Sequence, residues 1–415
     1  MNYLSRELEV FLGKIISERP LVYLNGPRQV GKSTLANNIL SVNDVNYISF
    51  DAPFILASAK SDPAVFINSL PKNKLNIIDE IQMAPEIFRY LKIAIDERRL
   101  QGETAGLYLL TGSANLLALP GLSEALVGRM SVLTLLPFSS TEYMQSKTNF
   151  IERLFGQELE YRKYDEYDLL EVIKNATYPE LAVNPNINRI QWLDDYLTTI
   201  LQRDVRNVAD IKNPEKIIML LSLLSLRAGG LINNSEVAME VGLDARTYEK
   251  YKASVLNTFI IFELKSWSKP NRINKRFTKS PKLYFTDTNM LSYVMKRDMD
   301  DVYKTDKVAF GHLFENFVAT EIKKNISSLK DVEISHFRTS DFKEVDFVLE
   351  KYNGDTIGIE VKLSATVDAK DLRGLKVLKD AVGDKFKKGV VVYTGREVVP
   401  LGENLWAVPV CYFWQ

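Results

Sequence analysis

The sequence predicts an α/β protein with an open α/β sheet in its first third and a smaller α/β part near its C-terminus. The β-prone run 21–25 leads through a glycine-bounded loop into the helical run 34–40, and strand-like and helical runs then alternate to Leu136. Near the C-terminus, strand-like runs at 333–338, 344–349 and 356–363 precede a helical run at 368–382 and further apolar strands. Such alternation is typical of α/β folds.

The first strand ends in the segment Gly-Pro-Arg-Gln-Val-Gly-Lys-Ser-Thr, which has the complete spacing of a P-loop. Backbone N–H groups of such a loop and of the following helix converge on phosphates, and side chains at Gly26 and Gly31 would obstruct them. Lys32 is placed to reach the β- and γ-phosphates, and the Ser33 hydroxyl to ligate Mg²⁺. The alternative is a chance glycine-rich turn, which the filled positions disfavour. The sequence therefore predicts binding of a nucleoside triphosphate.

Two acidic residues, Asp79 and Glu80, follow the apolar strand Lys74–Ile78. Parallel α/β sheets place ligand chemistry at the carboxyl ends of their strands. An Asp at this point can hold Mg²⁺, and the adjacent Glu can polarise an attacking water. The alternative is an ordinary surface acidic pair, which the preceding P-loop makes less favourable. We expect Asp79 to bind the metal and Glu80 to act in catalysis.

A polar residue is expected after the next strand, Leu107–Leu110, where it could sense the γ-phosphate or orient water. Ser113 and Asn115 are both candidates, and a helix N-cap is the alternative role. A helix around Leu122–Val127 then ends at Arg129, before the strand Ser131–Leu136. This arginine could reach the nucleotide of a neighbouring subunit, or it could be a helix C-terminal cation.

This order of strands, loops and helices resembles the AAA+ ATPases. The segments 26–34, 76–85, 109–115 and 127–142 together resemble a prokaryotic AAA+ subfamily whose members carry a C-terminal domain similar to PD-(D/E)xK nucleases. The resemblance implies an ATPase with ATP and Mg²⁺ as cofactors and a homo-oligomeric state. It implies nucleotide binding by Gly26, Arg28, Gly31, Lys32, Ser33, Thr34 and Asp79, and catalysis by Glu80, Arg129 and Ser113 or Asn115.

Four domains follow from this resemblance: an AAA+ core at 1–140, a helical lid at 141–230, a winged-helix-like domain at 231–300 and a nuclease-like domain at 301–415. Long helices are expected at 190–209 and 214–227. The segment 233–264 has a helix-turn-helix pattern, in which Ser235 caps a helix, Gly242 makes the turn and 245–256 forms a second helix.

The segment 265–282 contains seven basic residues and no acidic one, with Trp267 and Phe277 between them. A basic wing of this kind would bind nucleic-acid phosphates. The alternative is a solvated hairpin beside a protein-docking domain. The basic residues are Lys265, Lys269, Arg272, Lys275, Arg276, Lys279 and Lys282.

The C-terminal run of helix, strands and helix resembles the PD-(D/E)xK nuclease core, with Val345 rather than proline before Asp346. The resemblance implies that Glu315, Asp346 and Glu360 hold Mg²⁺ and that Lys362 activates water. Glu360 and Lys362 are two residues apart on one strand and share a face. The alternative is a nuclease-like fold that no longer cleaves and serves for docking, because a fold does not guarantee its usual function.

Composition limits the other possibilities. The 415 residues suggest two to four domains, and 53 basic against 53 acidic residues leave no net charge, so a nucleic-acid surface must be local. One cysteine, Cys411, excludes an internal disulfide and fits a reducing compartment, while two histidines are too few for a zinc site. The charged N-terminus is no signal peptide. The longest apolar stretch, 217–226, is too short for a membrane span. We expect a cytoplasmic protein without a membrane partner.

The sequence thus predicts a Mg²⁺-dependent ATPase that acts on DNA, with the C-terminal domain cutting or gripping it. The alternative is a nucleotide-dependent switch or scaffold whose inactive nuclease-like domain docks a protein partner. The basic segment favours the first, and the neutral net charge leaves the second open. The DNA structure, the pathway and the number of subunits have no signature in the sequence.

Overall fold

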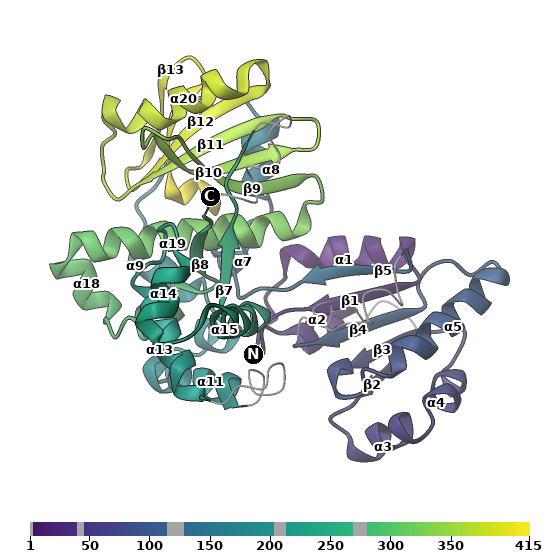
Figure 1. The fold of residues 1–415 in the computed structure, drawn as a ribbon. Helices are drawn as coiled ribbons and strands as arrows, with labels where there is room; N and C mark the ends of the chain where they lie inside the picture. Colours follow the sequence, from purple (N-terminus) through teal and green to yellow (C-terminus); the bar gives the residue numbers. More distant parts are fainter. Residues whose placement is uncertain (1–2, 40–44, 114–127, 203–212, 269–279) are drawn as a thin grey trace. The chain divides into compact units, whose positions relative to one another are not determined.

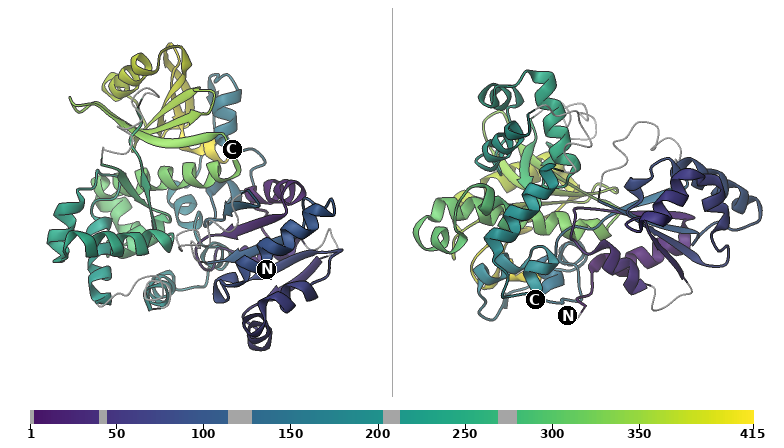
Figure 2. Two further views of the ribbon diagram at one scale, coloured as in Figure 1. Left: turned by 45° about the vertical axis from the view of Figure 1, so that its right-hand side comes forward. Right: turned by 90° about the horizontal axis from the view of Figure 1, so that it is seen from below.

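The computed structural model describes residues 3–39, 45–113, 128–202, 213–268 and 280–415 (Figures 1 and 2). These residues form two compact units. The smaller unit comprises 5–136 together with 257–259, and the larger unit comprises 1–4, 137–256 and 260–415. The predicted division into four domains stays a prediction. None of the helices in these ranges has both the length and the apolar character that crossing a membrane requires.

The smaller unit is built on a five-stranded parallel sheet in the order β2-β3-β4-β1-β5. The α/β sheet predicted for this part of the chain is confirmed, and the structure shows that its strands are parallel. Each pair of parallel neighbours requires a crossover connection. The strands are β1 (Leu21–Asn25), β2 (Val45–Ser49), β3 (Leu75–Asp79), β4 (Tyr108–Gly112) and β5 (Met130–Thr134).

Both faces of this sheet are covered, because every residue of β1 is buried and side chains alternate between the faces. Leu21 and Tyr23 belong to a core with residues of α5, including Phe88 and Leu91. The segment between β2 and β3 contains two helices, since Asp62 caps a new helix that begins at Pro63. The helices are α1 (Glu7–Glu18), α2 (Lys32–Ile39), α3 (Pro53–Ser61), α4 (Pro63–Ser69) and α5 (Ile87–Leu100).

The described residues of the first part of the larger unit, from 137 to 256, are mostly helical. The helix-turn-helix pattern is confirmed as two helices: Asn233 rather than Ser235 caps the first, and Gly242 ends it in a left-handed conformation with φ +68°. The helices are α7 (Ser140–Tyr143), α8 (Phe150–Gly156), α9 (Leu169–Asn175), α10 (Pro179–Val183), α11 (Arg189–Ile200), α13 (Pro214–Ser225), α14 (Asn234–Val241) and α15 (Ala245–Asn257).

Strands β7 (Ile261–Leu264) and β8 (Lys282–Phe285) form an antiparallel pair after α15. The long helix α19 (Lys307–Asn325) is fixed to β8 through Asn316, whose side chain hydrogen bonds with both the N–H and the C=O of Phe285. Helices α17 (Thr288–Val294) and α18 (Met299–Thr305) connect β8 with α19. These contacts place β8 directly beside the helix that carries Glu315.

A seven-stranded mixed sheet completes the larger unit, in the order β6-β13-β14-β12-β11-β10-β9. Helix α20 (Arg373–Val382) covers one face of it (Figure 1), where Leu375 and Leu378 pack with Val345, Val348 and Val391. The sequence did not indicate β6 or β13. The strands are β6 (Arg162–Lys163), β9 (Val332–Arg338), β10 (Glu344–Lys351), β11 (Thr356–Lys362), β12 (Phe386–Tyr393), β13 (Glu397–Gly402) and β14 (Leu405–Pro409).

Candidate functional site

The two glycines that bound the loop after β1 have conformations that other residues rarely adopt. Gly26 has φ +145°, and a Cβ at this position would lie 2.0 Å from the carbonyl oxygen of Leu135. Gly31 has φ +88° and directly precedes α2. A side chain at Gly26 would therefore clash with the backbone that follows β5, so the loop depends on glycine here for packing as well as for ligand access.

Lys32 begins α2 and is buried, with its ammonium group held by the loop itself. Nζ donates to the carbonyl oxygens of Gly26 at 3.1 Å and Pro27 at 2.7 Å. Arg28 lies in the same loop and is half-buried, whereas Thr34 is exposed in the first turn of α2. The loop thus concentrates positive charge and N-terminal helix amides at one end of the sheet, an arrangement suited to phosphate.

Asp79, the last residue of β3, is buried and accepts hydrogen bonds from hydroxyl groups of three other segments. Ser33 donates at 2.9 Å, Tyr47 of β2 at 2.7 Å, and Thr111 of β4 also donates to it. Burial, together with the bond to Asp79, raises the pKa of the Tyr47 hydroxyl, which keeps it a donor. The Ser33 hydroxyl and the Asp79 carboxylate are hard oxygen ligands, which is the donor set that Mg²⁺ prefers.

Glu80 follows in a left-handed conformation, with φ +58° and ψ +40°. This conformation is uncommon outside glycine, and such strain is typical of functional sites. The Gln82 amide donates to the Glu80 carboxylate and, at 3.1 Å, to the Ser113 hydroxyl. Burial and the neighbouring charge of Asp79 raise the pKa of Glu80, which Lys32 partly offsets. A half-buried carboxylate with a raised pKa suits a general base.

The strand order explains how these groups meet. Because β4 lies between β1 and β3, its carboxyl end brings Thr111 and Ser113 between the P-loop and Asp79. Ser113 is therefore beside Glu80, linked to it through Gln82. Asn115 lies outside the described residues, as does the helix expected at 122–127.

Three residues of this site were not singled out from the sequence: Tyr47, Gln82 and Thr111. Thr111 had a usable signal, since it directly follows the predicted strand 107–110 at the expected ligand-binding edge. Tyr47 and Gln82 had none, because their roles depend on which strands become neighbours in the sheet.

Arg129 lies just before β5 and forms a bidentate ion pair with Asp96 of α5. Nε lies 2.6 Å from Oδ1 and Nη2 lies 2.9 Å from Oδ2. The hydrogen bond from Arg129 lowers the pKa of Asp96. The guanidinium is thus held within its own unit, and its action on a neighbouring subunit stays a prediction.

Two of the three acidic residues predicted for a C-terminal metal site, Glu315 and Asp346, lie around a lysine together with Glu344, whereas Glu360 pairs with Lys362. Lys282, the first residue of β8, is 2 % exposed, and its Nζ lies 3.1 Å from Asp346 Oδ1, 2.6 Å from Glu344 Oε1 and 3.5 Å from Glu315 Oε1. Burial alone would lower the pKa of Lys282, but the carboxylates raise it, so it stays charged. Within the described residues, no group of three or more His, Cys, Asp or Glu side chains is arranged to hold a metal.

The remaining groups of this cluster also have partners, except Glu360 Oε2, which is buried without a hydrogen bond within the described residues. Asp346 Oδ2 accepts from the backbone N–H of Val361 at 3.0 Å, and Lys362 Nζ lies 2.9 Å from Glu360 Oε1. Tyr284 donates to Glu315 Oε1 at 2.8 Å. Burial and the nearby Asp346 charge raise the pKa of Glu315 to about 7 and that of Glu360 to about 8. The fold therefore brings Glu315 and Asp346 to the ammonium group of Lys282, while Glu360 pairs with Lys362.

The basic segment differs in part from the expectation of an exposed wing. Lys282 is buried in the acidic cluster, so it is not available to phosphate. Trp267 is 5 % exposed and packs edge-on against Phe337, so it is no stacking platform for bases. Backbone hydrogen bonds join Lys265 and Trp267 to His336 of β9. The other five basic residues and Phe277 lie outside the described residues.

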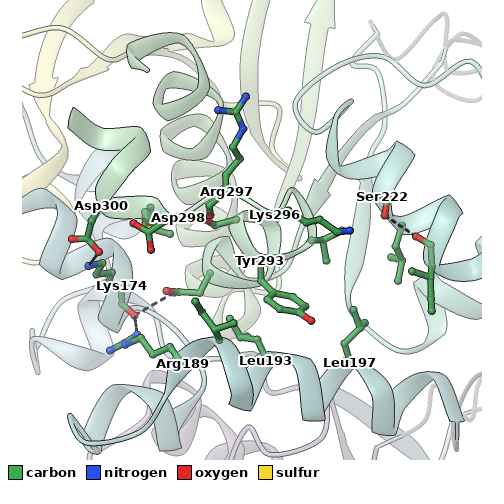
Figure 3. Close-up of a pocket in the computed structure, with 17 residues that line it drawn as sticks. Lys174, Arg189, Leu193, Leu197, Ser222, Tyr293, Lys296, Arg297, Asp298 and Asp300 are labelled. Carbon is green, nitrogen blue, oxygen red and sulfur yellow. Dashed lines mark hydrogen bonds and ion pairs between the residues drawn. The ribbon is translucent and has the colours of Figure 1, made fainter. Parts of the chain in front are cut away.

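A cavity of about 510 Å³ lies in the larger unit, apart from the acidic cluster (Figure 3). Leu193 and Leu197 of α11 form part of its apolar wall. Lys174 pairs with Asp300, and Arg189 donates to the carbonyl oxygen of Lys174 at 2.6 Å. These charged groups form ion pairs and hydrogen bonds within the cavity wall, so the fold accounts for their contacts.

Three regions of the chain match known family models. Residues 18–144 match an AAA domain, which supports a P-loop ATPase of the AAA type. Residues 167–301 and 310–413 match two domains of unknown function, DUF8612 and DUF4143.

Relatives span nearly the whole chain. Uncharacterized proteins Mb2031c of Mycobacterium bovis and Rv2008c of Mycobacterium tuberculosis are each 24% identical over 406 residues, which is 97% of this chain and 83% of the relative. A Walker-type ATPase of Pyrococcus abyssi is 15% identical, with a TM-score of 0.44 over 70% of this chain and 96% of its own. A RuvB structure of Thermotoga maritima is 19% identical, with a TM-score of 0.29 over 61% of this chain and 84% of its own.

Proposed function

We propose that this protein is a Mg²⁺-dependent ATPase whose hydrolytic site is the P-loop together with Asp79 and Glu80. The observation that carries the proposal is the convergence on Asp79 and Glu80 of groups from the P-loop, β2 and β4, through Ser33, Tyr47 and the Gln82–Ser113 contact. Phosphoryl transfer depends mainly on positioning and charge stabilisation, which such a site supplies.

Each residue has a distinct role in this proposal. Lys32 binds the β- and γ-phosphates, and Gly26, Arg28, Gly31 and Thr34 shape the loop around them. Ser33 and Asp79 hold Mg²⁺, which neutralises developing phosphate charge when bound. Glu80 accepts the proton of the attacking water, and Gln82 orients the carboxylate and links it to Ser113. Arg129 stabilises phosphate charge from a neighbouring subunit of a homo-oligomer.

The test is hydrolysis by the Glu80→Gln variant with saturating ATP and Mg²⁺. Loss of a general base should lower turnover roughly 100- to 10,000-fold while ATP binding is retained. Lys32→Ala should instead lose ATP binding. Glu86→Gln, which alters an exposed carboxylate close by in the chain, is the matched control. Turnover near that of the unaltered protein in Glu80→Gln would remove Glu80 from the mechanism.

We further propose that ATP hydrolysis drives work on DNA, and that the protein binds the DNA through the basic segment of a winged-helix-like domain. The support is the cluster of cations at 265–279 in a chain without net charge. Replacing Lys275 and Arg276 with alanine should weaken binding to every DNA sequence. It should also reduce the slope of log K against log salt concentration by roughly 0.7–0.9 for each phosphate that the protein no longer neutralises. Lys147→Ala with Lys304→Ala, at two exposed lysines elsewhere, is the control. An unchanged slope would assign the segment to a solvated surface.

The second candidate is a nucleotide-dependent switch whose nuclease-like C-terminal domain docks a protein partner. Burial of Lys282 and Trp267 favours it, because neither side chain is then accessible to DNA. The two candidates differ in one measurement, which is the stimulation of ATP hydrolysis by DNA. Stimulation that Lys275→Ala with Arg276→Ala abolishes supports the first candidate, and hydrolysis indifferent to single-stranded, duplex and branched DNA supports the second.

A further inference from the structure

The acidic cluster of the larger unit is balanced by a cation that belongs to the chain itself. Three carboxylates, from α19 and β10, surround the Lys282 ammonium group: Glu315, Glu344 and Asp346. Like charges brought this close repel one another unless a cation lies between them. In a metal-dependent nuclease that cation is a divalent ion. Here the ammonium group of Lys282 supplies it.

The distances and charges around Lys282 are unfavourable for binding a divalent ion. Mg²⁺ requires oxygen ligands at roughly 2.0–2.1 Å in a nearly octahedral shell. Asp346 Oδ1 is 3.1 Å from the ammonium nitrogen, so an ion bound to that oxygen would lie next to another positive charge. The second oxygen of Asp346 accepts the Val361 N–H, which orients the carboxylate. Glu315, Glu344 and Asp346 therefore do not fit a metal as long as Lys282 is in place.

The position of Lys282 is fixed by packing. All four residues of β8 are buried, and Lys282 pairs with Leu264 in the β7–β8 ladder. Further along β8, the backbone of Phe285 is hydrogen-bonded to Asn316 of α19, and Tyr284 donates to Glu315. The lysine is thus inserted by a strand anchored to the same helix that carries Glu315. Withdrawing it would require breaking these contacts.

We infer that Lys282 permanently takes the place of a divalent cation in this cluster, which makes the cluster a metal-independent structural centre joining β8, β10 and α19. The nuclease-like domain then lacks the ion on which phosphodiester hydrolysis would depend. This inference is independent of ATP hydrolysis, whose residues belong to the smaller unit.

The first experiment compares Mn²⁺ binding to the full chain and to Asp346→Asn by calorimetry without nucleotide. Asparagine keeps an oxygen that can accept the Val361 N–H, so the cluster retains most of its shape. Equal numbers of bound ions are expected, because Asp346 holds none. One more ion in the unaltered protein, or Mn²⁺-dependent nicking of plasmid DNA that Asp346→Asn abolishes, would overturn the inference.

The second experiment removes the internal cation with Lys282→Met, which keeps the length of the side chain. In EDTA the melting temperature should fall by several degrees, because three carboxylates lose their counter-charge. Millimolar Mn²⁺ should restore the melting temperature and occupy one additional binding site. The double variant Lys282→Met with Asp346→Asn should lack this site. A variant that gains no site and no Mn²⁺-dependent recovery contradicts the inference. Should Lys282→Met fail to fold, the first comparison decides alone.

Discussion

At the scale of single residues, Glu80 combines three properties that favour its role as a base. Its backbone is left-handed, its carboxylate accepts a hydrogen bond from Gln82, and burial raises its pKa. The left-handed conformation changes the chain direction immediately after β3. As a result, the carboxylate of Glu80 contacts Gln82, which also reaches Ser113, while Asp79 contacts Ser33 and Tyr47.

The raised pKa of Glu80 predicts the pH dependence of hydrolysis. A general base acts only when it is deprotonated, so turnover should fall as the pH decreases through this pKa, above the range of an ordinary glutamate. The hydrogen bond from Gln82 lowers the pKa in opposition to burial. Gln82→Met should therefore move the acidic limb of the turnover profile to higher pH. An acidic limb that is unchanged in Gln82→Met would contradict the assigned contact.

At the scale of elements, two helical glycines have opposite environments. A Cβ at Gly374 of α20 would lie 1.8 Å from the carbonyl oxygen of Glu344, whereas one at Gly311 of α19 would meet nothing within 4 Å. Gly374 thus permits α20 to approach β10 closely, and this approach supports the strand that carries Asp346. Gly311 has no such role in packing.

Alanine at these two positions should change stability in opposite directions. Gly311→Ala should stabilise by about 0.5–1 kcal/mol, because glycine loses more backbone entropy in a helix. Gly374→Ala should destabilise by about 3 kcal/mol, the upper end of typical overpacking costs. Urea unfolding followed by tryptophan fluorescence measures both, since all four tryptophans belong to the larger unit. Equal effects of the two variants would show that α20 can move away from β10.

At the scale of the whole molecule, variants of Arg129 distinguish a monomeric from an oligomeric mechanism of ATP hydrolysis. Within the chain it pairs with Asp96, so a structural role predicts that Arg129→Ala and Asp96→Asn destabilise the smaller unit alike. A role in a neighbouring site predicts instead that Arg129→Ala loses hydrolysis and Asp96→Asn retains it.

Mixing inactive variants tests the same point directly. Arg129→Ala keeps an intact P-loop and Lys32→Ala keeps an intact arginine, so mixed oligomers contain interfaces with both. Such mixtures should recover part of the ATPase activity, measured as phosphate release at equal total protein. No recovery, or a chain that stays monomeric with ATP in analytical ultracentrifugation, would rule out the action of Arg129 between subunits.

The sequence by itself determined the α/β sheet of the smaller unit, the loop from Gly26 to Ser33, and the strand that ends at Asp79. These features depend on residues close together in the chain, where glycine spacing and apolar periodicity report directly on backbone conformation. Most of the strands of the C-terminal sheet were predicted for the same reason. The strands β6 and β13 were not predicted. Strand β6 is only two residues long and pairs with β13, which lies more than two hundred residues further along the chain.

Only the tertiary structure decided which side chains meet. Tyr47 and Thr111 contact Asp79 because β2 and β4 are the neighbours of β3, and strand order has no local signature in the sequence. The neighbours of Lys282 in the chain predict that it belongs to a basic surface. Folding buries it among Glu315, Glu344 and Asp346, and a charge buried beside opposite charges has a different chemistry from the same charge in water.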